Sequence, residues 1–174
     1  QAKSITRTIV STDDKNIANI SKEFGAEAPF LRPANISGDD ILDFPVIKHF
    51  LEYLDIFEQI QPDILVFLRP TMPTRSAKEI DEVINLLIKN EKADCIRTTR
   101  PAVYPPFWMK KINTEGFLEP YDNHVIPFCM KRRQDLPKVV MCDGFVDAAR
   151  VESILAKNNF PAGKQIAFYR ESVP

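Results

Sequence analysis

The pattern of apolar and polar positions divides the chain into short extended segments and amphipathic helices. Runs of β-branched and other apolar residues predict strands over residues 8–11, 28–31, 64–68, 93–98, 139–148 and 165–169. Apolar residues at helical spacing predict helices over residues 16–24, 43–54, 77–90 and 150–158. Strands that alternate with helices in this order predict an α/β fold with a mostly parallel sheet flanked by helices.

Two of the helices have start signals with a clear physical basis. Ser76 and Glu79 have the spacing of a capping box, in which each side chain accepts a hydrogen bond from the other residue's backbone N–H. Asp43 has the position of an N-cap, whose carboxylate would accept a bond from the first helical turn. Pro45 fits that turn, because the first turn of a helix does not use its N–H groups.

Residues 101–137 differ in composition from the rest of the chain. Prolines and aromatic residues are frequent there, and short alternating runs predict antiparallel strands around a turn at Glu115 and Gly116. We interpret this segment as an insertion within one domain that spans residues 1–174.

The end of the predicted strand over residues 64–68 is the best candidate for a binding site. The strand stops at Arg69 and Pro70, and a polar loop that ends in a second arginine, Arg75, leads into the next helix. Ligands of open α/β sheets bind just beyond the carboxyl ends of the strands. The two arginines predict that this ligand is an anion.

Composition narrows the functional classes. The 174 residues include 23 basic and 24 acidic residues, so no overall positive field favours nucleic acid. The three cysteines have no CxxC spacing, which argues against zinc or disulfides and fits the reducing cytoplasm. No apolar run reaches the roughly 20 residues of a membrane span, and no signal peptide is recognisable. We expect a cytoplasmic protein that binds neither nucleic acid nor a membrane.

A series of short motifs occurs in order along the chain: Ile9–Asp13, Phe24–Glu27, Phe30–Ala34, Ser37–Asp40, Leu68–Arg75, Leu136–Val140 and Asp143–Asp147. Together they resemble the acylneuraminate cytidylyltransferases, the CMP-sialic acid synthetase-like family. The similarity extends over nearly the whole chain. The resemblance implies a Rossmann-like α/β domain in which residues 101–137 form a dimerisation insert, and therefore a homodimer.

The resemblance also implies a reaction. The anomeric hydroxyl of a nonulosonic acid, a nine-carbon keto-acid sugar, would attack the α-phosphorus of a nucleoside triphosphate and release pyrophosphate. Mg²⁺ would bridge the phosphate oxygens. Two elements of the family have no counterpart in the sequence: a basic triphosphate-binding loop, expected before residue 1, and an Asp-x-Asp metal pair, expected after residue 174. We therefore assign no catalytic and no metal-binding residue.

By the same resemblance, Arg32, Ile41 and Asp43 contact the nucleotide. Asp43 stands where the sialic acid enzymes tend to have serine, and an ionised carboxylate only accepts hydrogen bonds. Such a group suits the N1–H and N2–H₂ of guanine, so GTP is an alternative to CTP. Two simpler interpretations stay open: Arg32 forms an ion pair with Asp39 or Asp40, and Asp43 is only an N-cap.

The resemblance assigns Arg69, Thr71, Met72, Asp143 and Asp147 to the sugar. Arg69 replaces a common glutamine and could pair with the sugar carboxylate in bidentate fashion; the simpler alternative is a structural arginine that bonds loop carbonyls. Met72 replaces a frequent serine, which makes that wall less polar and indicates a deoxy or N-acyl sugar. Asp143 and Asp147 share one strand face and would bind sugar hydroxyls; a metal pair is the alternative.

Two other functions stay open. The enzyme could be a guanylyltransferase for a legionaminic-type sugar, which Asp43, Arg69 and Met72 favour. The chain could instead be a non-catalytic dimer that binds a sugar or nucleotide, which the missing family elements favour. Covalent catalysis is not predicted, since neither His49 nor His124 has a serine or cysteine partner in a nucleophile motif.

Overall fold

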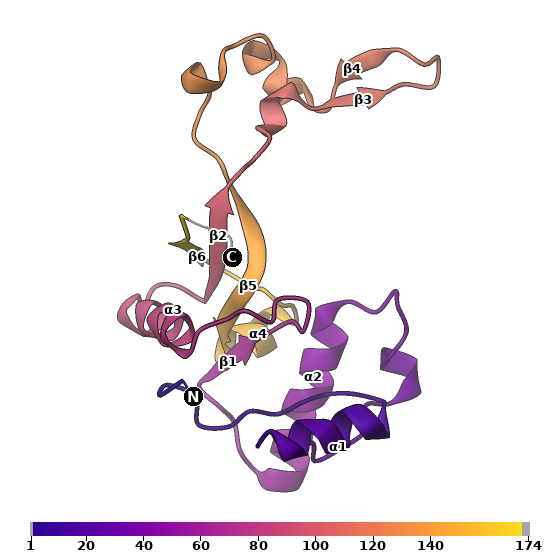
Figure 1. Cartoon of the computed structure of the whole chain (residues 1–174), viewed down its shortest axis with the longest axis vertical. Coiled ribbons are helices and arrows are strands. Elements are labelled where there is room, and N and C mark those ends of the chain that lie inside the picture. Colours follow the sequence, from indigo (N-terminus) through magenta and orange to yellow (C-terminus); the bar gives the residue numbers. More distant parts are fainter. Residues whose placement is uncertain (1, 172–174) are drawn as a thin grey trace. The chain divides into compact units, whose positions relative to one another are not determined.

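The computed structural model describes residues 2–171, and within them the central sheet has the strand order β1-β5-β2-β6 (Figure 1). The strands are β1 (Ile64–Phe67), β2 (Cys95–Pro101), β5 (Val140–Arg150) and β6 (Gln165–Tyr169). The helices are α1 (Lys15–Glu23), α2 (Asp43–Tyr53), α3 (Ala77–Lys89) and α4 (Val151–Lys157). A π-helical turn extends α2 over Leu54–Glu58.

Three of the four sheet strands run in the same direction. β5 is antiparallel to β1, with Val66 opposite Ala148 and Phe67 opposite Asp147. β5 is also antiparallel to β2. The N–H of Arg150 bonds to the carbonyl oxygen of Asp94, and the N–H of Val146 bonds to Thr98 Oγ1, so residue numbers rise along β2 as they fall along β5. β6 advances along β2 in the same sense, from the Asp94 N–Lys164 O bond to the Arg170 N–Thr99 O bond. This confirms the predicted α/β fold with a mostly parallel sheet.

The predicted capping box of α3 is present in full. Ser76 Oγ accepts from the Glu79 N–H at 3.2 Å, and Glu79 Oε2 accepts from the Ser76 N–H at 3.1 Å. The apolar face that this helix buries is formed by Val83, Ile84 and Leu87. The start of α3 is therefore determined locally, directly after the loop that contains Arg69.

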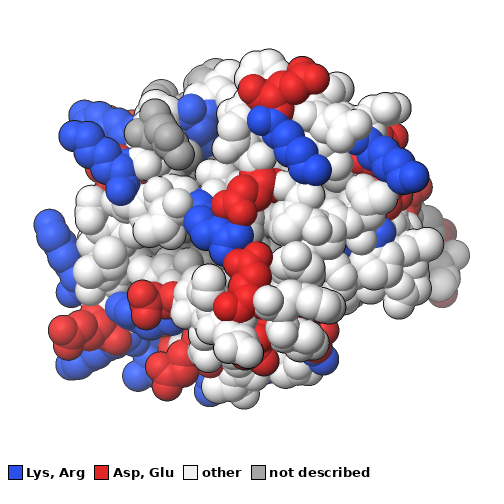
Figure 2. Space-filling view, turned by 90° about the horizontal axis from the view of Figure 1, so that it is seen from below, with Lys and Arg blue, Asp and Glu red and all other residues white. Residues whose placement is uncertain are grey.

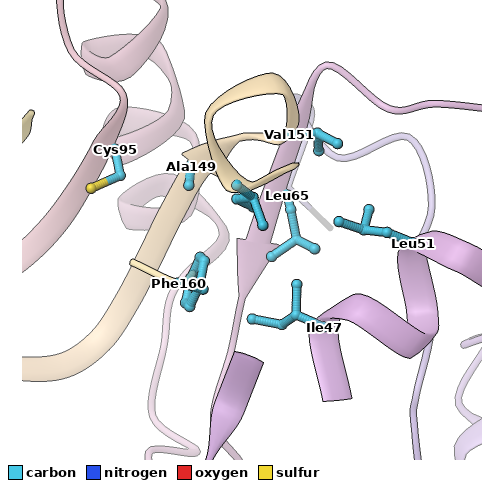
Figure 3. Packing of buried hydrophobic residues seen from close by; sticks show 8 residues of the cluster. Ile47, Leu51, Leu65, Cys95, Ala149, Val151 and Phe160 are labelled. Carbon is cyan, nitrogen blue, oxygen red and sulfur yellow. The ribbon is translucent and has the colours of Figure 1, made fainter. Parts of the chain in front are cut away.

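One hydrophobic cluster joins α2 to the sheet. Figure 3 shows Ile47 and Leu51 of α2 pointing toward Leu65 of β1, with Ala149 of β5 and Phe160 beside them. Ile47 and Leu51 are separated by one helical turn, so they share the face that meets the strand. This packing holds the first residues of α2 close to the end of β1.

A second cluster covers another part of the sheet. Val83 and Leu87 of α3 pack with Ile96 of β2 and with Phe145 and Val146 of β5, and all five are completely buried. β5 is buried continuously from Phe145 to Ala149. A charged side chain on this part of β5 must therefore have partners, because an isolated buried charge is very costly.

The chain divides into two compact units. Unit 1 contains residues 2–98 and 144–168, and unit 2 contains residues 99–143 and the described residues from 169 onward. Unit 2 includes the antiparallel strands β3 (Lys110–Ile112) and β4 (Leu118–Pro120), with Lys111 opposite Glu119. It also has short 3₁₀ turns at Pro106–Trp108, Asn123–Phe128 and Arg133–Asp135. The predicted insert over residues 101–137 lies within unit 2; its role in dimerisation stays a prediction.

The two strands predicted nearest the start of the chain are wrong. Residues 8–11 and 28–31 form no regular strand, and their neighbourhood has a single parallel bridge between Ile9 and Glu27. A 3₁₀ turn follows at Ala34–Ile36. Short apolar runs have strand-like composition, but a strand forms only where a partner supplies hydrogen bonds along its length.

The interpretation of Asp43 as an N-cap is also wrong. Leu42 is the N-cap residue of α2 and makes no side-chain capping bond, and Asp43 is the first helical residue. Its carboxylate instead accepts a hydrogen bond from Arg69. A charged donor outcompetes the neutral backbone N–H, because hydrogen bonds between ionised groups are about twice as strong.

Candidate active site

Hydrogen bonds from Arg75 join the loop after β1 to β5. Arg75 Nη2 donates to the carbonyl oxygen of Arg69 at 2.6 Å, and Arg75 Nε donates to the carbonyl oxygen of Phe145. Burial lowers the pKa of Arg75, and the nearby charge of Arg69 adds to this effect. The guanidinium nevertheless stays protonated at neutral pH. Arg75 therefore determines where the backbone of Arg69 lies.

Arg69 joins two acidic side chains from different elements. Its Nη1 lies 2.6 Å from Asp147 Oδ2 on β5, and its Nη2 donates to Asp43 Oδ2 at the start of α2. The guanidinium carbon also lies 4.9 Å from the ring centre of Phe67. All these groups belong to unit 1. The structure thus brings together Arg69, Asp43 and Asp147, which the family resemblance assigns to two different ligands.

Asp147 has a second basic partner, Arg97, to which the sequence assigns no role. Arg97 of β2 places Nε 3.1 Å from Asp147 Oδ1 and Nη2 3.5 Å from Asp147 Oδ2. Asp147 is completely buried, and two guanidiniums compensate its charge. A signal was present in the sequence: Arg97 follows the apolar pair Cys95-Ile96 within a strand, where a charge requires a buried partner.

Gly144 of β5 lies beside the side chain of Arg69. Its φ is +68°, a conformation that residues with a Cβ rarely adopt, and a Cβ there would lie 3.6 Å from Arg69 Nη1. Gly144 directly precedes the buried run of β5. The backbone conformation at this position therefore favours glycine, whereas a Cβ would meet Arg69 only at ordinary van der Waals distance.

The two acidic partners of Arg69 differ in exposure. The Asp43 side chain is 40% exposed, that of Asp147 is 0% exposed, and that of Arg69 is 27% exposed. Burial opposes the charge on Arg69, but the hydrogen bonds to Asp147 and Asp43 outweigh this and raise its pKa. The site therefore presents a fixed, partly accessible cation at the carboxyl end of β1, as an anion-binding site requires.

The other residues assigned to the sugar lie in different settings. Thr71 is exposed on the same loop as Arg69, and Met72 is half-buried against the α3 cluster. Asp143 belongs to unit 2, where its carboxylate contacts Arg170 Nη1 at 2.9 Å. Both of these side chains are nearly buried, at 3% and 7% exposure for Asp143 and Arg170. Their roles in sugar binding stay predictions.

The remaining residues assigned to the nucleotide lie in the segment before α2. Arg32 Nε donates to Ser37 Oγ at 3.1 Å, and Arg32 Nη2 lies 3.6 Å from Asp13 Oδ1. The acidic neighbour of Arg32 is thus Asp13, in place of the predicted Asp39 or Asp40. Ile41 is 37% exposed, just before α2. Both side chains are accessible to a ligand, and their contact with a nucleotide stays a prediction.

The described residues do not form a metal site. No group of three or more histidine, cysteine or acidic side chains within residues 2–171 is arranged to hold a metal ion. Asp43 and Asp147 each bond to arginine, and a guanidinium repels a cation from the same carboxylate. The alternative interpretation of Asp143 and Asp147 as a metal pair is not supported, because each has an arginine partner.

The surface charge is organised in small groups. On the face shown in Figure 2, basic and acidic side chains of the described residues are interleaved between uncharged areas. Arg7, for example, pairs with Glu27 at 2.6 Å and Glu58 at 2.5 Å. No helix within residues 2–171 is long and apolar enough to cross a membrane.

Comparison with known proteins identifies relatives of this chain. No protein-family model matches it. It is 28% identical over 120 residues to the CMP-N,N'-diacetyllegionaminic acid synthase of Legionella pneumophila, an alignment that covers 68% of this chain and 50% of the relative. It is 29% identical over 83 residues to the pseudaminic acid cytidylyltransferase of Campylobacter jejuni, which covers 48% of this chain and 35% of the relative. The chain thus matches half or less of the length of these relatives.

A solved structure shows the same fold. The structure of CMP:2-keto-3-deoxy-manno-octonic acid synthetase complexed with CTP matches with a TM-score of 0.62 and 13% sequence identity. The match covers 98% of this chain and 75% of that chain. Relatives, motif order and fold all agree with the resemblance to the CMP-sialic acid synthetase-like enzymes.

Proposed function

We propose that the protein containing this chain is a cytidylyltransferase that activates a nonulosonic acid. The anomeric hydroxyl of the sugar attacks the α-phosphorus of CTP, a new P–O bond forms, and pyrophosphate leaves. The observation that carries the proposal is Arg69: a buried carboxylate holds its guanidinium at the carboxyl end of β1, and the guanidinium is partly accessible. The names of the relatives, both of which make CMP-sugars or transfer cytidylyl groups, support the same substrate class.

In this proposal Arg69 binds the carboxylate of the sugar. A guanidinium recognises a carboxylate with two parallel hydrogen bonds and thereby orients the sugar as well as attracting it. Arg75 contributes indirectly, because it holds the carbonyl of Arg69 and so the position of the loop. Correct placement of the sugar relative to the α-phosphorus is the main way such a site accelerates the reaction.

CTP is the favoured nucleotide. The case for GTP depended on Asp43, whose free carboxylate would accept hydrogen bonds from guanine. In the structure this carboxylate bonds to Arg69 instead. The main reason to prefer guanine is thereby weakened, and GTP serves as the comparison in the assay.

We infer that catalysis also depends on Mg²⁺, as the family resemblance implies. The residues described in the structure do not fit a site for this ion, since the carboxylates around Arg69 are neutralised by arginine. No step of the mechanism is therefore assigned to residues that hold Mg²⁺. Removal of divalent cations with EDTA tests the dependence directly.

We also propose that unit 2 forms a homodimer contact. Its hairpin exposes Ile112 and Leu118, at 71% and 72%, and these two residues are opposite each other across β3 and β4. Phe117 and Tyr121 beside them are also more than half exposed. Adjacent exposed apolar and aromatic side chains are typical of subunit interfaces.

The test is a parallel assay of the complete protein with CTP and GTP. Each nucleotide is combined with Mg²⁺ and with N,N'-diacetyllegionaminic, pseudaminic or N-acetylneuraminic acid, and both pyrophosphate and product mass are measured. We expect pyrophosphate and a CMP-sugar with at least one acid. A GMP-sugar would support the guanylyltransferase alternative. No product with either nucleotide would contradict the proposed function.

A further inference from the structure

We propose that Asp43 is an internal competitor for the ligand carboxylate at Arg69, and that it thereby sets the affinity of the site for acidic sugars. The inference rests on the proposed function, because it takes Arg69 as the group that binds the sugar acid. Its basis is the arrangement around the Arg69 guanidinium, where the Asp43 carboxylate already occupies the Nη2 side. An incoming carboxylate must displace this group or share the guanidinium with it.

The two carboxylates on Arg69 are not equally replaceable. Asp147 is fully buried on β5 and is held by Arg97 as well as by Arg69. Breaking that contact would leave a buried carboxylate without one of its counter-ions, which is strongly unfavourable. Asp147 therefore stays in place and continues to orient Arg69 when a ligand binds.

Asp43 has the opposite properties. Its side chain is 40% exposed, and Arg69 is the partner that the structure records for it. When it leaves Arg69, water can solvate the carboxylate immediately. Asp43 is also the first residue of α2, and the N-terminus of a helix stabilises a negative charge there even without Arg69. Releasing Asp43 is therefore inexpensive compared with releasing Asp147.

The chemistry of Asp43 matches that of the ligand group. A sugar carboxylate and the aspartate carboxylate have the same charge, size and hydrogen-bond geometry, so both fit the Nη2 side of Arg69. A simple acid that gains only this one contact exchanges one carboxylate for another and binds weakly. An acid that also contacts the loop through its hydroxyl or acyl groups overcomes the competition. Asp43 thus lowers the affinity of the site for every carboxylate, so that only acids with further contacts to the loop bind tightly.

The experiment compares the complete wild-type protein with Asp43→Asn by isothermal titration calorimetry, using N,N'-diacetyllegionaminic acid and its methyl ester. Asparagine keeps the shape of the side chain and removes its charge. We expect the acid to bind Asp43→Asn about two- to fivefold more tightly than wild type, the range for a partly exposed ion pair. The uncharged ester should bind both proteins equally.

Two further variants make the result specific. Asp40→Asn removes an exposed carboxylate from the loop just before α2. The acidic partners that the structure shows for Arg69 are Asp43 and Asp147, so Asp40→Asn serves as the control. Its affinity for the acid should stay close to that of wild type. Asp43→Ser removes the carboxylate in a second way and should reproduce the gain, which guards against an effect peculiar to asparagine.

Each other outcome has a defined meaning. Equal or weaker binding of the acid by Asp43→Asn and Asp43→Ser would overturn the inference, and weaker binding would show that Asp43 assists ligand binding. An equal gain for acid and ester would also overturn it, because the competition would not be for the carboxylate. If wild type forms a CMP-sugar but the variants bind no more tightly, the inference alone fails. If no protein binds or converts any sugar acid, the proposed function fails with it.

Discussion

Arg69 and Asp147 are separated by 78 positions in the chain, yet Arg69 Nη1 lies 2.6 Å from Asp147 Oδ2. The contact connects the loop after β1 to the buried middle of β5. It converts a flexible arginine into a fixed cation whose orientation is determined by the core. The pair is thus both part of the fold and the base of the candidate site.

Replacing Asp147 by asparagine should destabilise the fold by about 2–3 kcal/mol, toward the low end for a broken buried ion pair because both arginines are partly exposed. The amide cannot compensate the charges of Arg69 and Arg97, which bond to it from two elements. Urea unfolding followed by circular dichroism measures the change. Asp40→Asn is the control and should change stability by less than about 0.5 kcal/mol. Equal effects of the two variants would contradict this account.

Replacing Arg75 by methionine should loosen the loop that contains Arg69. The variant keeps the apolar stem but leaves the carbonyls of Arg69 and Phe145 without this donor. We expect a loss of about 1–3 kcal/mol in stability, the usual cost of unsatisfied buried polar groups. The KM for the sugar acid should rise. Lys78→Met, on the exposed surface of α3, is the control and should have little effect on either quantity.

Gly163→Ala should be far more harmful than Gly25→Ala. Both glycines have positive φ, at +71° and +84°, so both alanines introduce backbone strain of about 1 kcal/mol or more. A Cβ at position 163 would lie 2.0 Å from Asp94 Oδ2, whereas one at position 25 meets nothing within 4 Å. Melting temperatures of the two variants test the difference. Similar melting temperatures would show that Asp94 moves aside without cost.

Stability should fall in acid partly through Asp94. Hydrogen bonds from Ser153 Oγ at 2.6 Å and from the Lys164 N–H at 2.5 Å lower the pKa of Asp94 below its ordinary value of 3.8. The unfolded chain therefore binds this proton first. The stabilisation is complete above the unfolded pKa and is lost as pH falls through the lower folded pKa.

The variant Asp94→Asn tests this contribution. It should be less stable than wild type near neutral pH, because asparagine cannot accept both hydrogen bonds as a carboxylate does. Its stability should decline less steeply than that of wild type as pH falls below about 4, near the ordinary pKa of aspartate. Thermal unfolding between pH 3 and pH 7 gives both slopes. Identical slopes would show that Asp94 does not contribute to acid sensitivity.

The double variant Ile112→Glu, Leu118→Glu should be monomeric. The two side chains are exposed cross-strand neighbours on the hairpin of unit 2, so the charges should affect folding little and a dimer contact strongly. Multi-angle light scattering at micromolar concentration gives the molar mass. Ile56→Glu introduces a charge at an equally exposed apolar position in unit 1, at 66% exposure, and should leave the dimer intact. A monomeric wild type would contradict the assignment of the insert.

The sequence predicted an element well where all the residues of its signal are close together in the chain. The capping box of Ser76 and Glu79 involves residues three apart, so it starts α3 without tertiary help. The strand over Gln165–Tyr169 has the predicted limits. The strands predicted over residues 8–11 and 28–31 were wrong, because strand formation is not a local property. Their composition suits a strand, but a strand depends on partners that are distant in the sequence.

The sequence by itself determined the α/β order of elements, the resemblance to the CMP-sialic acid synthetase-like enzymes and the position of Arg69 at a strand end, because periodicity, capping and motif order are local properties. The tertiary structure decided what Arg69 contacts. It moved Asp43 from an expected helix cap to an ion pair, and it brought Arg97, with no assigned role, to Asp147. Such pairings depend on packing of α2 and β5 around β1, and a buried charge takes the partner that the folded core places beside it.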